Sequence, residues 1–240
     1  MKKSGTLYIV ATPIGNLEDI TLRAIRILKE VELIACEDTR QTRKLLTRFE
    51  IRKKLISYYQ PREKERIPYI IRSLKEGKDV ALVSDSGTPG ISDPGFPLIR
   101  EAIKERIEVV PVPGASAITS ALTASGLPTD RFLFIGFPPR KKEKLKKMIK
   151  VLKDEESTLV FFLPANRLLA FLELIQDTLG ARQAVIAREM TKIHEEFLRG
   201  ETGALIEILK EGVPKGEVTL LLSGRKKKEK KTNLPGNGRS

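Results

Sequence analysis

The chain has 240 residues, of which 40% are hydrophobic and 31% are charged, and its net charge is +13. This balance excludes a disordered chain, and no apolar run is long enough to span a membrane or to form a secretory signal. A single cysteine, Cys36, and a single histidine, His194, exclude an internal disulfide and a zinc site of nitrogen and sulfur ligands, so we expect a cytoplasmic protein without a metal.

The first half of the chain alternates apolar runs with amphipathic segments, a pattern that predicts strands followed by helices. In chain order we expect strand Thr6–Ala11, helix Ile20–Val31, strand Leu33–Cys36, helix Thr39–Phe49, strand Leu55–Tyr58, helix Glu65–Glu76, strand Val80–Ser84, a helix from Asp93-Pro94 to Lys104, strand Glu108–Val112 and helix Ser116–Ser125. Asp19, Asp38 and Asp93 are the expected N-caps of three of these helices. The strands are apolar throughout, which indicates a largely parallel sheet covered on both faces.

The second half contains a further set of elements after the break at Gly126-Leu127-Pro128. We expect strand Phe132–Gly136, helix Lys141–Leu152, strand Thr158–Phe162, helix Arg167–Leu179, strands Gln183–Ala187 and Glu195–Arg199, helix Thr202–Leu209 and strand Glu217–Ser223. Two strands in succession without a helix indicate a mixed sheet. The expected organisation is therefore two α/β domains, residues 1–115 and 116–224, followed by a basic disordered tail, residues 225–240.

Positive charge is concentrated in two short segments. Arg140–Lys150 has seven basic residues and one acid, and Arg225–Lys231 has six basic residues and one acid, so together they supply +11 of the net charge. Such segments suit a polyanion such as RNA, and a solvated helix face with a disordered tail is the alternative. Aromatic residues make up only 5% of the chain, so extensive base stacking is not expected.

Three Gly/Pro-rich loops each follow a predicted strand of the first half. They are residues 12–16, 84–90 and 111–116. In a parallel sheet the carboxyl ends of the strands share one edge, where ligands bind, so we expect a ligand site there. The dinucleotide and P-loop fingerprints are absent and the loops carry no Lys or Arg, which argues against a triphosphate. An adenosine-like ligand held by backbone groups and by the carboxylate of Asp85 would fit.

Six motifs in order make the chain similar to a known family. They are TPIGNLEDIT (12–21), EDTR (37–40), SDSGTPGISDPG (84–95), VPGASA (112–117), SGLPTDRF (125–132) and AREMTK (187–192). These motifs resemble the branch of the tetrapyrrole methylase superfamily that methylates the ribose 2′-hydroxyl of a cytidine in 16S (small-subunit) ribosomal RNA. The resemblance runs from about residue 6 to residue 224.

The resemblance implies a homodimer that binds S-adenosyl-L-methionine in a cleft between two α/β domains and acts on small-subunit ribosomal RNA or the 30S subunit. The cofactor-binding residues that it implies are Pro13, Gly15, Asp85, Ser86, Gly87, Thr88, Pro89, Ile91, Ser116, Ala117, Phe162, Leu163, Ala187 and Arg188. The expected RNA-binding residues are Arg140, Lys141, Lys142, Lys144 and Arg167. One segment departs from the family pattern: relatives carry an aromatic–acidic–Ser–Pro–His–Arg run where residues 162–167 read FLPANR, so that only Arg167 persists.

A ribose hydroxyl is a poor nucleophile, so methyl transfer to it needs a base or a charge-stabilising group. The candidate bases are Asp38, Asp93 and Glu189, and the candidate stabilisers are Arg40, Arg188 and Lys192. Helix capping is the alternative for Asp38 and Asp93, and a structural ion pair is the alternative for Glu189. Two other functions stay open: methylation of a precorrin-like tetrapyrrole by the same fold, and a non-catalytic RNA-binding role in ribosome assembly.

Overall fold

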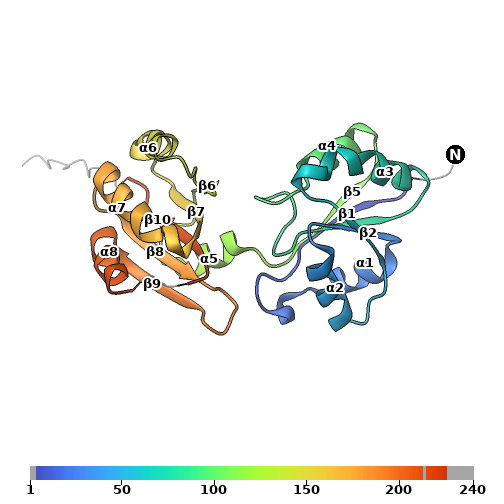
Figure 1. Cartoon of the computed structure of the whole chain (residues 1–240), viewed down its shortest axis with the longest axis horizontal. Helices are drawn as coiled ribbons and strands as arrows, with labels where there is room; N and C mark the ends of the chain where they lie inside the picture. Colours follow the sequence, from blue (N-terminus) through green and yellow to red (C-terminus); the bar gives the residue numbers. More distant parts are fainter. Residues whose placement is uncertain (1–3, 213–214, 226–240) are drawn as a thin grey trace, which may run out of the picture. The chain divides into compact units, whose positions relative to one another are not determined.

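The structure is a computed structural model that describes residues 4–212 and 215–225. By their contacts the residues divide into two compact units (Figure 1). The first unit holds the residues up to Ala124 together with Ala187–Phe197, and the second holds Ser125–Ile186 together with the residues from Leu198 onward. The predicted fold class, two α/β units with a parallel and a mixed sheet, is confirmed.

The first unit is built on a five-stranded sheet with the order β3-β2-β4-β1-β5, in which all neighbouring strands are parallel. The strands are β1 (Leu7–Val10), β2 (Leu33–Cys36), β3 (Lys54–Ser57), β4 (Val80–Val83) and β5 (Val109–Val112). The helices are α1 (Leu22–Glu30), α2 (Thr39–Arg48), α3 (Glu63–Lys75), α4 (Phe96–Lys104) and α5 (Ala117–Ser125), with short 3-10 helices η1 (Leu17–Asp19) and η2 (Gln60–Arg62).

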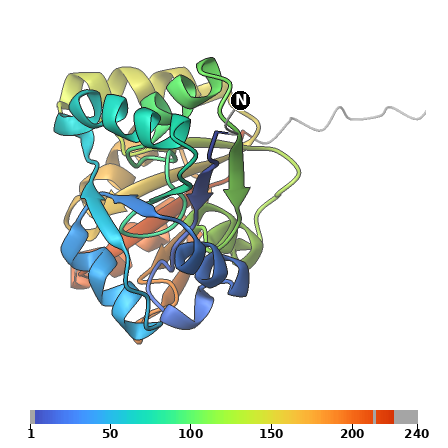
Figure 2. The same ribbon diagram turned by 90° about the vertical axis from the view of Figure 1, so that its right-hand side faces the viewer.

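Alternating side chains of these strands enter two cores on opposite faces of the sheet. In β2, Leu33 and Ala35 pack with residues of α3 and α4, whereas Ile34 and Cys36 pack with residues of α1 and α2. Figure 2 shows the same division, with α1 and α2 on one face of the sheet and α3 and α4 on the other. Both faces are therefore buried, which explains why these strands are apolar without alternation.

The helix starts differ from prediction in two places. Asp19 does not cap α1, because residues 17–19 form η1 and the hydroxyl of Thr21 accepts the N–H of Ala24 instead at 3.0 Å. Asp93 does not cap α4, which begins at Phe96 after the N-cap residue Gly95. The expected cap by Asp38 is confirmed at the start of α2.

The second unit holds a mixed sheet with the order β6-β7-β10-β8-β9, in which β7 is parallel to β6 and antiparallel to β10. Its strands are β6 (Phe132–Gly136), β7 (Thr158–Pro164), β8 (Gln183–Arg188), β9 (Glu196–Glu201) and β10 (Glu217–Leu222). Its helices are α6 (Lys142–Val151), α7 (Leu168–Leu179) and α8 (Thr202–Glu211), with η3 (Leu152–Asp154) and η4 (Ala165–Arg167). Side chains of α6, α7 and α8 share one hydrophobic core with β7, β8 and β10.

The change of unit after Ala124 falls at the end of α5, whereas the predicted boundary at residue 115 lies at its start. The loop before α5 is tied to the first unit, since the hydroxyl of Thr88 donates to the carbonyl of Ala115 at 3.5 Å. Of the predicted tail, only Arg225 lies within the described residues. Among the described helices, none has the length and apolarity needed to cross a membrane.

Candidate functional site

The carboxyl ends of β1, β2, β4 and β5 lie at one edge of the parallel sheet. The three predicted Gly/Pro-rich loops leave the sheet at this edge, after β1, β4 and β5, and the Glu37-Asp38 turn leaves it after β2. The cofactor-binding residues predicted between Pro13 and Ala117 therefore all lie along this edge.

The loops after β1 and β4 are held together by a small backbone bridge. The N–H of Thr12 donates to the carbonyl of Gly87 at 2.9 Å, and the N–H of Gly87 donates to the carbonyl of Thr12 at 3.1 Å. The hydroxyl of Thr12, which is buried, also donates to the carbonyl of Ser84 at 3.1 Å. Gly87 has a φ of +85°, and a Cβ there would lie 3.3 Å from a methyl of Ile14, so glycine suits this bridge.

Acidic side chains extend from the same edge. A carboxylate oxygen of Asp85 accepts the backbone N–H of Asp38 at 3.0 Å, which fixes the turn after β2 to the loop after β4. Asp38 itself accepts the N–H of Arg40 at 2.8 Å and pairs with the Arg40 guanidinium at 2.7 Å. Hydrogen bonding from Arg40 lowers the pKa of Asp38 to about 2, so this carboxylate is a very weak base.

The pKa values of three other carboxyl groups at this edge are raised instead of lowered. Burial, and then the charge of Glu37, raise the pKa of Asp93 to about 6. Burial of the carboxyl group, and then the charge of neighbouring carboxylates, also raise the pKa of Asp85 and the pKa of Glu37. Asp85 is nevertheless exposed as a whole residue. Carboxyl groups that repel one another in this way favour a cationic ligand, which would relieve the repulsion.

The segment 187–197 lies against the loop after β1, within the first unit. A Cβ on Gly15 would lie 2.6 Å from Lys192 Cγ, 2.7 Å from Thr191 Oγ1 and 3.0 Å from the carbonyl oxygen of Met190. Only glycine permits this approach. The contact brings together Gly15, predicted to bind the cofactor, and Lys192, predicted to be catalytic.

The charged side chains of this segment are paired with one another. Arg188 Nε lies 3.0 Å from a carboxylate oxygen of Glu196, and Lys192 Nζ lies 3.0 Å from a carboxylate oxygen of Glu189. The structural ion pair that was the alternative for Glu189 is therefore present. Ala187 is buried, and Glu189 and Thr191 have φ values of 47° and 66°, which mark a tightly turned backbone.

The remaining predicted residues lie in the second unit. Leu163 is buried in the hydrophobic core of that unit, and its contact with the cofactor stays a prediction. Phe162 packs its ring against Phe134 and Phe137. Arg167 was predicted to bind RNA, but its guanidinium donates to the carbonyls of Pro138 and Pro139 and braces the connection before α6. The other four residues predicted to bind RNA, Arg140, Lys141, Lys142 and Lys144, are exposed.

Two features of the site were not predicted as site residues. Thr12 lies in the predicted loop 12–16, but the sequence did not predict that its hydroxyl would join this loop to the loop after β4. Thr191 Oγ1 is buried and has no hydrogen-bond partner among the described residues. This hydroxyl lies beside Gly15 and can bond to a ligand, but no local sequence signal distinguishes Thr191 from a surface threonine.

The residues present fit the expected S-adenosyl-L-methionine. Small side chains line the loops, and the free hydroxyl of Thr191 can bond to a polar ligand atom. The carboxyl group of Asp85, whose pKa is raised, suits a ligand that carries a positive charge. The contribution of Phe162 and of a cleft between the units stays a prediction.

Comparison with known proteins agrees with this geometry. Residues 6–206 match the family model described as Tetrapyrrole (Corrin/Porphyrin) Methylases. The chain is 50% identical to the protein named ribosomal RNA small subunit methyltransferase I of Halalkalibacterium halodurans over 93% of this chain and 78% of that protein. It is also 50% identical to the protein of the same name from Thermotoga maritima, over 92% of this chain and 99% of that protein.

The fold is also similar to solved structures. The crystal structure of uroporphyrin-III-C-methyltransferase from Thermus thermophilus superposes with a TM-score of 0.63, at 19% identity, over 90% of this chain and 94% of that one. At this level of identity the similarity establishes the fold alone.

Proposed function

The chain belongs to the tetrapyrrole methylase family, and we propose that it transfers a methyl group from S-adenosyl-L-methionine to the ribose 2′-hydroxyl of a cytidine in small-subunit (16S) ribosomal RNA. The family and the cofactor are established: the chain is an S-adenosyl-L-methionine-dependent methyltransferase. The substrate and the position of the methyl group are the proposal.

One observation carries this choice of substrate. Identity of 50% to the two named ribosomal RNA methyltransferases extends over more than nine-tenths of the chain, whereas identity to the tetrapyrrole methyltransferase structure is 19%. The basic residues from Arg140 to Lys150 support it, because they suit a phosphate backbone and have no evident use for a small macrocycle.

When bound, S-adenosyl-L-methionine supplies a methyl group that is already activated on a sulfonium sulfur. The protein therefore has to position and shield the reactants and to accept a proton. We assign the positioning to the loops joined by Thr12 and Gly87, whose paired backbone fixes their spacing.

We assign the proton to Asp93. The bound cofactor would supply the methyl group, and the Asp93 carboxylate would accept the proton that the ribose hydroxyl gives up. Asp38 is a poorer acceptor because Arg40 holds its pKa at about 2, and Glu189 is already paired with Lys192. A group with a pKa of about 6 is ionised at neutral pH and is basic enough to assist.

The test is a transfer assay with tritiated S-adenosyl-L-methionine and three substrates. They are small ribosomal subunits from cells that lack this modification, the naked ribosomal RNA from those subunits, and uroporphyrinogen. The proposal predicts label in ribosomal RNA and none in the macrocycle.

Label in the macrocycle would instead support a tetrapyrrole methyltransferase. Labelling of none of the three, by protein that binds S-adenosylhomocysteine in calorimetry, would support a non-catalytic RNA-binding role. Fully modified subunits serve as the matched control, because they lack a free target hydroxyl.

A further inference from the structure

A polar hollow of about 330 Å³ lies within the second unit. It is bordered by η3, by the start of β8 and by the residues that follow β10. Three cationic side chains line it, those of Lys153, Arg182 and Arg225, together with two carboxylates, those of Asp154 and Glu201. The lining is therefore weakly positive.

Arg182 is a fixed part of this wall. Its guanidinium donates to the carbonyls of Lys153, at 3.0 Å, and Ser223, at 3.3 Å. Burial, and then the charge of Arg225, lower the pKa of Arg182, so the two cations repel each other across the hollow. An anion between them would relieve this repulsion.

The first residue of the second basic segment, Arg225, is one of the residues that line the hollow. The N–H of Arg225 donates to the carbonyl of Glu155 at 2.7 Å, and its guanidinium pairs with Asp154. Gly224 permits this contact, because a Cβ there would lie 1.9 Å from the carbonyl oxygen of Glu156. The residue that begins the second basic segment therefore lies beside the end of η3.

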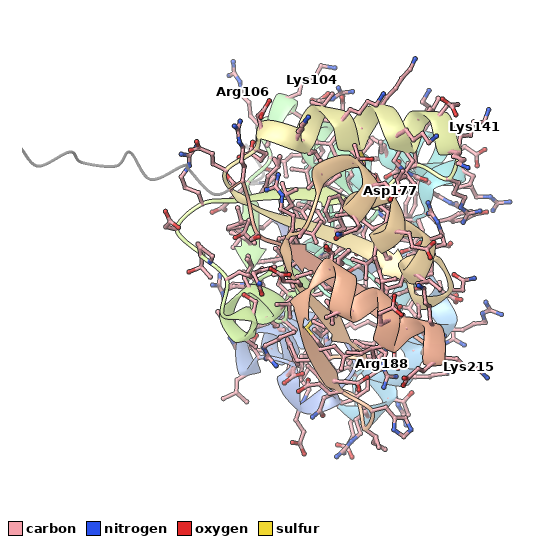
Figure 3. All side chains as sticks on the ribbon, turned by 90° about the vertical axis from the view of Figure 1, so that its left-hand side faces the viewer. Lys104, Arg106, Lys141, Asp177, Arg188 and Lys215 are labelled. Atoms are coloured by element: carbon pink, nitrogen blue, oxygen red, sulfur yellow. The ribbon has the colours of Figure 1, made fainter. Side chains whose placement is uncertain are left out.

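η3 directly continues α6, which carries the first basic segment. Figure 3 shows Lys141 at one end of α6, with nitrogen-tipped side chains projecting from this helix. Leu145 and Ile149 hold the opposite face of α6 in the core, so the lysines between them face outward. The basic surface thus continues from α6 through η3 to the hollow.

We propose that the hollow binds one backbone phosphate of a single-stranded RNA that follows the basic surface of α6, and this inference rests on the proposed ribosomal RNA substrate. A phosphodiester carries one negative charge, which three cations and two carboxylates can accommodate. A free phosphate or triphosphate carries more charge and would be repelled by Asp154 and Glu201. The hydroxyl of Ser223 accepts the N–H of Gln183 at 3.2 Å, which leaves its proton for a phosphate oxygen.

The test uses the full chain with Lys153→Ala and Arg225→Ala combined, and leaves Arg182 in place because it braces the wall. The probe is a fluorescein-labelled single-stranded oligonucleotide from small-subunit ribosomal RNA, and the measurement is anisotropy over a series of salt concentrations. We expect the Kd at low salt to rise about tenfold. The slope of log K against log salt should become shallower by about 0.7 to 1, as expected for the loss of one phosphate contact.

The matched control is Lys29→Ala combined with Lys210→Ala, which removes the same charge from two exposed positions on α1 and α8. An equal change in slope for both double variants would overturn the proposal, because only overall charge would then matter. The proposal would also be overturned if the Lys153→Ala, Arg225→Ala variant kept the salt slope of the unmodified protein but lost binding of inorganic phosphate in calorimetry. The hollow would then be a site for free anions.

This assay measures binding and not methyl transfer, so the two proposals can fail separately. A shallower slope in a protein that does not methylate ribosomal RNA would leave the phosphate site standing and reject the proposed function. Full methylation of ribosomal RNA by the unmodified protein, together with an unchanged slope in the double variant, would support the proposed function and reject the phosphate site. Equal unfolding temperatures for the two double variants would confirm that both are folded.

Discussion

Asp93 shows how the fold gives one carboxyl group a property that the others lack. It follows Ser92, which has a φ of 63°, in a loop that also contains Gly90 and Gly95. The surrounding loops bury its carboxyl, and Glu37 adds repulsion, so its pKa rises to about 6. The sequence placed an acid at this position, but only packing explains why it differs from Asp38.

Replacing Asp93 with Asn should lower kcat for RNA methylation by about 100-fold or more, because the proton of the attacking hydroxyl loses its acceptor. In the unmodified enzyme, kcat/KM should fall as the pH drops below about 6, where Asp93 becomes protonated. The affinity for S-adenosylhomocysteine, measured by calorimetry, should change little. Unchanged kcat in Asp93→Asn would exclude Asp93 as the base.

The same substitution should stabilise the protein at neutral pH. The pKa of Asp93 is about 6 in the folded state and about 3.8 when unfolded, so between these values the unfolded chain loses its proton first. The free energy of unfolding therefore carries a penalty that is absent below about pH 4 and complete above about pH 6. Asp93→Asn should remove roughly 1–3 kcal/mol of it at neutral pH.

Urea unfolding followed by circular dichroism at several pH values tests this expectation. The matched control is Asp177→Asn, at an exposed position on α7 (Figure 3). A stability difference between Asp93→Asn and the unmodified protein that is the same at acidic and neutral pH would contradict the pKa assigned to Asp93.

Gly15 is a residue where a single added carbon should be costly. Gly15→Ala would place a Cβ within 3.0 Å of Met190, Thr191 and Lys192 atoms. We expect it to lower the free energy of unfolding by about 1–3 kcal/mol and to expose residues 187–197 to proteolysis. Gly203→Ala is the control, since a Cβ there meets nothing within 4 Å, and equal behaviour of the two variants would refute the close contact.

At the scale of elements, the start of α4 depends on a residue from another helix. The N-cap Gly95 has no side chain, and its N–H donates to a carboxylate oxygen of the buried Glu63, at the start of α3, at 3.2 Å. Tyr58 lies beside Glu63, and burial, followed by the charge of Glu63, raises the pKa of Tyr58. This contact fixes the end of the loop that carries Asp93.

Glu63→Ala should therefore lower the free energy of unfolding by about 1–3 kcal/mol, because it leaves the Gly95 N–H without an acceptor. Glu63→Gln keeps an oxygen acceptor and should lose less. Glu65→Ala, at an exposed position of the same helix, is the control in urea unfolding. Similar losses for Glu63→Ala and Glu65→Ala would show that the contact does not hold α4.

The elements themselves could be predicted from local patterns. Continuous apolar runs located Leu33–Cys36 and Phe132–Gly136 with the bounds that the structure has. The start of α4 could not be found in this way, because Asp93-Pro94 has the usual form of a helix start and the actual contact comes from Glu63, about thirty residues earlier. Local signals fail where a distant side chain satisfies the helix end.

At the scale of the whole molecule, chain order alone does not reveal which unit a segment joins. The segment 187–197 contains the end of β8 and the start of β9, both strands of the second sheet, but its contacts assign it to the first unit. Gly15 and Thr191 are far apart in sequence, and no period or composition change connects them. The sequence could therefore supply the candidates Gly15, Glu189 and Lys192, but it could not predict that they lie close together in the fold.

The measurement that tests the central claim most directly is alkaline hydrolysis of the labelled product. A ribose 2′-O-methyl group blocks attack on the neighbouring phosphodiester, so alkali leaves the labelled nucleotide in a dinucleotide. The account predicts that tritium transferred to ribosomal RNA appears in an alkali-stable dinucleotide whose modified nucleotide is cytidine. Label released as a mononucleotide would place the methyl group on a base and contradict the account.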